Sequence, residues 1–203
     1  MSGSSGDGEK WPLAIGEKLG GVSLVGRRVD FLSNDGTEQH GFVLRDENKE
    51  GNVLVAYVDM RNGVISTKPW SANEIADFGK CAEFLSQERT MEEIWDIVDM
   101  FGRQIPVAMG DGVPVMARVT GADDESFNIQ FSESVNTYPV PTKEILIMAH
   151  LMTEVQRSDA FGLAAEINGD DARKGDYSLL FRFASGEWLS KKDYGRVKEL
   201  LKH

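Results

Sequence analysis

Aromatic side chains recur beside an acidic residue in the first third of the chain. The set comprises Phe31, Phe42, Tyr57, Asp59 and Trp70. The face of an aromatic ring attracts an ammonium or guanidinium group. A nearby carboxylate adds to this attraction. These five residues are therefore the candidate partner-binding site, and a positively charged group is the ligand that they would hold.

The same rings have a second interpretation as core residues, because a small β domain needs large apolar side chains inside. Their spacing does not separate a binding cage from a core. A further set of rings, Phe127, Phe131 and Tyr138, lies in a later β-rich segment and is open to the same two interpretations.

Catalytic and metal-binding motifs are missing from the sequence. The histidines His40, His150 and His203 lie far apart, and there is one cysteine. Metal sites and nucleophile–base pairs need such residues in defined arrangements. We therefore expect no catalytic residue, no metal site and no cofactor, so that the protein is not an enzyme. The alternative is an enzyme whose acidic residues meet only in the folded chain.

The chain is strongly acidic, with a formal net charge of −11 over 203 residues. Such a charge repels phosphate backbones and favours a partner with a basic surface. We therefore expect protein partners rather than nucleic acid. The alternative is a nucleic-acid contact through a basic C-terminal helix, whose candidate residues are Lys191, Lys192, Arg196, Lys198 and Lys202.

No apolar run approaches the roughly 18 residues that a membrane span requires, and the N-terminus lacks the pattern of a secretion signal. We therefore expect a soluble, intracellular protein without a membrane contact. The only cysteine, Cys81, has no partner for an intramolecular disulfide. We expect it to pack as a small hydrophobic residue on a helix, in a reducing compartment.

Short β-rich runs separated by turn residues fill the segment from residue 27 to residue 70. The runs cover 29–32, 40–44, 52–59 and 64–67. In 52–59 both alternating faces are apolar, which predicts a strand buried on both sides. Four or five short strands in so few residues suit a small bent barrel, since closure removes exposed edges.

A second segment, 104–142, repeats this layout with runs at 105–109, 115–119, 127–131 and 136–139. The two segments end on similar phrases, STKPWSANEI at 66–75 and NTYPVPTKEI at 136–145. Because proline cannot donate to a sheet ladder, Pro69 and Pro139 are predicted to mark where strand pairing stops. Similar runs and similar endings indicate a duplicated unit.

Helices are predicted after each segment. The first phrase contains a capping box at Ser71 and Glu74, and the second a cap at Thr142. Apolar spacing predicts one helix that includes Ile75, Phe78, Ala82 and Leu85, a second from a capping box at Thr90 and Glu93 to Phe101, and a third over 143–157. Residues 177–183 are predicted to form a strand, and Ser190 to begin a last helix.

The predicted fold is α+β. It resembles two small SH3-like, or Tudor-like, β-barrels joined by amphipathic helices, with a short C-terminal β/α segment. The preferred function is a non-enzymatic protein-binding or structural subunit of a larger assembly. The alternative that the Tudor-like resemblance implies is a reader of methylated Lys or Arg peptides. The expected parts are a tail (1–20), barrel one (21–75), a helical connector (76–103), barrel two (104–142), a helix (143–158) and the C-terminal segment (159–203).

Overall fold

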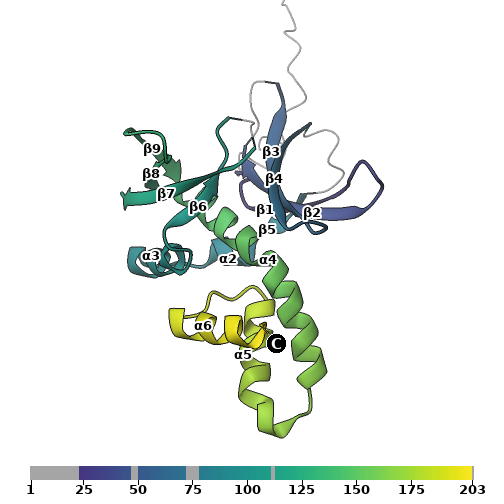
Figure 1. Ribbon diagram of the computed structural model, residues 1–203. Helices are drawn as coiled ribbons and strands as arrows, with labels where there is room; N and C mark the ends of the chain where they lie inside the picture. The colour runs from purple at the N-terminus through teal and green to yellow at the C-terminus, as the bar shows by residue number, and fades with distance from the viewer. Residues whose placement is uncertain (1–22, 47–49, 72–77, 111–112, 203) are drawn as a thin grey trace, which may run out of the picture.

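Two antiparallel sheets lie side by side and are joined to a helical layer by one long helix (Figure 1). The structure is a computed structural model that describes residues 23–46, 50–71, 78–110 and 113–202. The mixed α+β class predicted from the sequence is confirmed. Among the described helices, none is both long and apolar enough to cross a membrane.

The first sheet has the strand order β4-β3-β2-β1-β5. Its strands are β1 (Arg27–Leu32), β2 (Glu38–Arg45), β3 (Asn52–Asp59), β4 (Val64–Ser71) and β5 (Phe78–Cys81). Residues 78–81, predicted to be helical, instead pair with β1 as an edge strand. Cys81 is exposed there rather than packed on a helix. Ser71 of the predicted capping box is the last residue of β4, and its predicted partner Glu74 lies outside the described residues.

The second sheet has the strand order β6-β7-β8-β9. Its strands are β6 (Gln104–Val107), β7 (Val115–Ala122), β8 (Ser126–Gln130) and β9 (Thr137–Pro141). The four-stranded meander therefore occurs twice. Both copies also carry a register shift between their second and third strands, after Val43 in β2 and after Val119 in β7. This correspondence is in keeping with the duplication proposed from the sequence.

Both sheets are open, so the predicted closed barrels are not found. Within the described residues no ladder joins β4 to β5 or β6 to β9. The second sheet instead buries Ile105, Val119 and Phe127 in a core that it shares with helices. An apolar sheet face can be covered by a helix as well as by its own closure. The helices therefore fill the space that a barrel would enclose.

The two prolines lie inside strands and do not end them. Pro69 pairs with Leu54, and Pro139 pairs with Asn128. Both belong to edge strands, β4 and β9, which are the positions in a sheet where proline is tolerated. The prediction that pairing stops at these residues is therefore wrong, although β9 does end two residues after Pro139.

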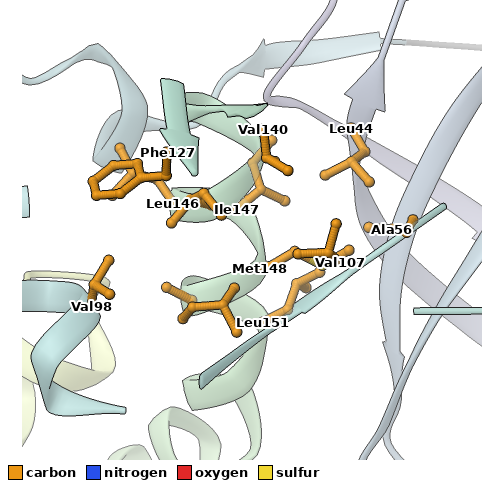
Figure 2. Close-up of a cluster of buried hydrophobic side chains, with 14 of the residues drawn as sticks. Leu44, Ala56, Val98, Val107, Phe127, Val140, Leu146, Ile147, Met148 and Leu151 are labelled. Atoms are coloured by element: carbon orange, nitrogen blue, oxygen red, sulfur yellow. The ribbon is translucent and has the colours of Figure 1, made fainter. Parts of the chain in front are cut away.

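A long helix, α4 (Thr142–Ile167), runs between the sheets. Figure 2 shows Leu146, Ile147, Met148 and Leu151 of α4 in one cluster with Leu44 and Ala56 of the first sheet and Phe127 and Val140 of the second. The helix extends ten residues beyond the predicted end at residue 157. Thr142 is not its cap: Pro141 occupies that position, and the buried Thr142 Oγ1 has no hydrogen-bond partner.

Two shorter helices lie between β5 and β6, namely α2 (Glu83–Ser86) and α3 (Met91–Met100). The capping box predicted for α3 is confirmed. The Glu93 N–H donates to Thr90 Oγ1 at 3.2 Å, and the Thr90 N–H donates to Glu93 Oε2 at 2.8 Å. These two bonds satisfy backbone donors that the first turn would otherwise leave unpaired.

The C-terminal layer is helical, with a short 3-10 turn (Asp171–Arg173), α5 (Lys174–Ala184) and α6 (Lys191–Leu200). The strand predicted at 177–183 is therefore wrong. Leu180 and Phe183, three residues apart, are both buried against α4 in a separate small core. Burial of these two helically spaced side chains outweighed the β propensity of the segment 177–183. Ser190 caps α6 as predicted, accepting a hydrogen bond from the Asp193 N–H.

Candidate aromatic site on the first sheet

Three aromatic side chains from three different strands meet on one face of the first sheet. The rings of Phe31 and Tyr57 have centroids 5.1 Å apart with their planes at 78°, and those of Phe31 and Trp70 are 4.9 Å apart at 52°. Residues separated by up to 39 positions in the chain thus form one cluster. Non-parallel rings at these distances have favourable edge-to-face electrostatics.

Strand alternation and register bring the cluster together. In β3, Val53, Val55 and Tyr57 point to the same face because side chains alternate along a strand. Trp70 pairs with Val53 across the β3–β4 ladder, which places its ring on that face too. Val53 and Val55 are buried in a small core with Leu24, Val29 and Val43, and Phe31 and Trp70 pack against its edge. The rings are therefore partly buried and partly open.

A glycine lets Tyr57 approach the neighbouring strand. Gly41 pairs with Tyr57 in the β2–β3 ladder. A Cβ at Gly41 would lie 2.6 Å from the Ala56 carbonyl oxygen and 2.9 Å from Val55 Cγ1. Real Cβ atoms do not come so close to a backbone oxygen, so only glycine fits this position without a shift of β3.

Two carboxylates border the rings and are both held by one arginine. Arg61 donates from Nε to Asp59 Oδ1 at 3.0 Å and from NH2 to Asp59 Oδ2 at 2.9 Å. Its NH1 donates to Asp35 Oδ2 at 2.6 Å. A guanidinium fork suits this two-point contact. Arg61 therefore links the β1–β2 and β3–β4 turns.

Both acids are stabilised in their charged form. Hydrogen bonds from Ser33 and Thr37, followed by the charge of Arg61, lower the pKa of Asp35 well below its ordinary value. Hydrogen bonds from the Arg61 side chain and backbone lower the pKa of Asp59. Both carboxylates consequently stay ionised throughout the neutral range and into mild acid, so that their pairing with Arg61 persists.

An exposed hollow of about 330 Å³ lies over this cluster, lined by Phe31, Tyr57, Asp59 and Trp70 among others. Lys68 also lines it, and its Nζ lies 4.4 Å from the centroid of the Trp70 ring. Aromatic faces, carboxylates and a bound cation thus share one hollow. Chemically, the arrangement can hold a positively charged group by cation–π attraction.

Phe42 is the one predicted site residue that lies elsewhere. It alternates with Gly41 and therefore points to the opposite face of the sheet, where it is 6% exposed. There its ring contacts Phe84 and His150, with centroids 5.5 Å away in each case. Phe31, Tyr57, Asp59 and Trp70 are brought together, whereas Phe42 belongs to the core between the first sheet and α4.

Sequence reasoning missed Asp35, Arg61 and Lys68. A signal was present for Lys68, because a residue two positions from Trp70 on a strand shares its face. Asp35 lies in a turn, and its distance from Arg61 depends on the β1–β3 arrangement, so spacing alone did not indicate the pair. The rings of the second segment do not repeat the site: Phe127 is fully buried, while Phe131 lies 6.0 Å from Tyr138.

A larger groove of about 830 Å³ lies between the two sheets and the start of α4. Its floor is apolar and includes Leu44, Ile94 and Leu146. Four acidic residues line it, namely Asp46, Asp124, Glu125 and Glu144. Glu144 is paired with Arg45, whose Nε lies 2.8 Å from Glu144 Oε1. No histidine or cysteine is among the residues that line the groove, so it contains neither a Ser–His nor a Cys–His pair.

Part of the basic surface of α6 is engaged within the chain. Arg196 pairs with Asp176 at 3.2 Å and with Glu199 at 3.5 Å. Lys198 lies over the Tyr194 ring, 5.0 Å from its centroid. Tyr194, Val197 and Leu200 of the same helix are buried. The helix therefore serves the C-terminal core, and its cations are partly neutralised.

Comparison of the chain with protein-family models, with curated proteins and with solved structures gives no match.

Proposed function

We propose that the protein is a non-enzymatic protein-binding module whose aromatic site holds a methylated cationic side chain of a partner. The observation that carries the proposal is the convergence of Phe31, Tyr57 and Trp70 from three strands beside Asp59. Partly open rings at the edge of a small core are placed for a ligand as well as for packing. On this proposal the first sheet is an open relative of the SH3-like, Tudor-like group.

The charge of the chain supports a cationic partner. A net charge of −11 attracts basic peptides from a distance and makes their association fast and sensitive to salt. At the site, a cation over an aromatic face gains about 0.5–2 kcal/mol, depending on how far it is desolvated. Methylation of an ammonium lowers its hydration and so favours the ring surface over water.

Proline disfavours strand addition at three of the four sheet edges. The edge strands β4, β6 and β9 contain Pro69, Pro106 and Pro139, respectively, and the fourth edge strand, β5, has only four residues. Proline lacks the N–H that an added strand would need. Insertion of a partner side chain into the aromatic hollow therefore accounts for recognition better than pairing at a sheet edge does.

The proposal is tested by calorimetric titration with one basic peptide in unmodified, trimethyl-lysine and dimethylarginine forms. We expect a methylated form to bind and Trp70→Ala or Tyr57→Ala to weaken binding at least tenfold. Phe161→Ala is the matched control, since Phe161 is 64% exposed on α4 and remote from the site in sequence. Equal binding by the Trp70 and Phe161 variants, both shown to be folded, would reject the proposal.

A role as a structural subunit is the second candidate, and an exposed apolar surface favours it. Met109, Val113, Val115 and Met116 are 51%, 76%, 53% and 48% exposed around the β6–β7 connection. Clustered apolar exposure of this kind marks interaction surfaces. A tagged pull-down with and without nuclease tests it: a protein partner that survives nuclease and is lost with Met116→Glu is expected, and retention of that partner by the variant would count against this surface.

A further inference from the structure

The aromatic site of the free protein is already occupied by a cation of the chain itself. Lys68 and Trp70 are two residues apart on β4 and share one face of the sheet, which places the ammonium 4.4 Å from the ring centroid. We infer that Lys68 is an internal competitor that a ligand cation must displace from Trp70. This inference rests on the proposed function and adds a means of regulating it.

Lys68 is held weakly enough to be displaced. Its side chain is exposed, and among the described residues it takes part in no ion pair. The nearby carboxylate of Asp59 is bound at both oxygens by Arg61 instead. The ring contact is therefore the main interaction that Lys68 loses when a ligand replaces it. An exposed contact of this type corresponds to about a twofold to fivefold change in affinity.

The contacts of Arg61 also favour one class of ligand over another. A guanidinium ligand needs carboxylate oxygens in a planar fork, and Arg61 already provides that fork for Asp59 and reaches Asp35. A methylated ammonium needs no hydrogen-bond acceptor and can take the position of the Lys68 ammonium directly. The site should consequently prefer trimethyl-lysine to dimethylarginine.

Modification of Lys68 would then act as a switch. Acetylation removes the charge of a lysine and with it the cation–π contact. Lys68 is exposed on an edge strand and so is accessible to a modifying enzyme. Loss of its charge should free the Trp70 face and raise the affinity for the ligand.

The test is titration of one basic trimethyl-lysine peptide into the wild type and into Lys68→Thr, Lys68→Arg and Lys80→Thr. Threonine keeps β propensity while removing both the stem and the charge. Lys80→Thr makes the same change in net charge on β5 of the same sheet, away from the hollow. We expect Lys68→Thr to bind about twofold to fivefold more tightly, while Lys68→Arg and Lys80→Thr stay near the wild type.

Two results would overturn the inference. If Lys68→Thr binds as the wild type does, or more weakly, while Trp70→Ala abolishes binding, Lys68 is no competitor but the proposed function stands. If Trp70→Ala binds as tightly as the wild type, the proposed function fails and the inference fails with it. An equal gain for Lys68→Thr and Lys80→Thr would assign the effect to net charge and likewise reject competition at Trp70.

Discussion

Gly41 and Tyr57 lie directly opposite each other in the β2–β3 ladder, and a Cβ on Gly41 would be 3.0 Å from the Tyr57 Cβ. The same Cβ would be 2.6 Å from the Ala56 carbonyl oxygen, so β3 must shift to admit it. We therefore expect Gly41→Ala to lower the free energy of unfolding by about 1–3 kcal/mol, as overpacking usually does. Chemical denaturation measures this loss.

Gly121 supplies a control because it is also a strand glycine, paired with Asn128 in the β7–β8 ladder of the second sheet. A Cβ there would come no closer than 3.7 Å, to Asn128 Nδ2, which is an ordinary contact. Gly121→Ala should leave stability within about 1 kcal/mol of the wild type. If both glycine variants unfold at the same denaturant concentration, the close approach at Tyr57 is not the cause.

Phe31 and Phe42 separate the site from the core. Phe42 is 6% exposed in the core beside α4, so Phe42→Ala should lower the free energy of unfolding by about 3–5 kcal/mol. Phe31 is partly exposed at the hollow, so Phe31→Ala should cost less stability yet weaken binding of a methylated peptide. Denaturation and titration of both variants check this. The conservative variant Phe42→Leu should bind the peptide as the wild type does. If Phe42→Leu weakens binding and Phe31→Ala does not, Phe42 belongs to the site and Phe31 does not.

The predictions from sequence succeeded where local signals and burial agreed. The run at 52–59 was predicted to be buried on both faces, and Val53 and Leu54 do belong to two different cores. The capping box at Thr90 was also identified correctly. The strand predicted at 177–183 failed because its apolar residues fit α4 at helical spacing, a tertiary contact that β propensity does not contain.

The site was predicted in part for the same kind of reason. Residue types alone indicated Phe31, Tyr57 and Trp70. Phe42 lies on the other face of the sheet because side chains alternate along β2, and the residue types do not show which face each position of a strand takes. Arg61 and Asp35 meet because two turns lie at the same end of the sheet. Barrel closure was overestimated because the sequence does not show that α4 covers the apolar faces.

His150 should make stability depend on pH. Burial, followed by the positive charges of Arg157 and His40, lowers the pKa of His150 from 6.5 to about 3. His150 is therefore protonated below about pH 6.5 in the unfolded chain, but only below about pH 3 in the folded chain. Stability from this group is fully present above pH 6.5 and falls as the pH drops through that interval, by up to about 1.4 kcal/mol per pH unit.

The measurement is the difference in unfolding free energy between wild type and His150→Phe from pH 7.5 to pH 4. Phenylalanine keeps the stack on Phe84, whose ring centroid is 4.1 Å from that of His150 at 10° between planes. Carboxylates common to both proteins cancel in the difference. We expect the variant to gain relative to the wild type as the pH falls below 6.5, and a difference that is constant with pH would contradict the lowered pKa.

Arg157 should hold the C-terminal layer to α4. It is 5% exposed and donates from Nε to Thr153 Oγ1 at 2.8 Å and from NH1 to the carbonyl oxygens of Phe183 and Glu187. Its guanidinium also lies 4.4 Å from the Phe183 ring centroid. Arg157→Ala removes three hydrogen bonds from a charged donor, each worth about 1.5–3 kcal/mol, although the Phe183 carbonyl still accepts from the Gly186 N–H and the Thr153 hydroxyl still donates to the His150 carbonyl. We therefore expect a loss above about 3 kcal/mol in total.

Hydrogen exchange locates this loss, because Arg157 connects α4 with Phe183 of α5 and with Glu187 after it, and not with the sheets. Amides of α5 and α6 should exchange faster in Arg157→Ala, while amides of β2 and β3 keep their protection. Arg182→Ala is the matched control: Arg182 forms an exposed pair with Glu187, worth about 1 kcal/mol or less. If amide exchange in Arg157→Ala accelerates equally in the sheets and in the C-terminal helices, the two cores unfold together and Arg157 does not stabilise the C-terminal layer specifically.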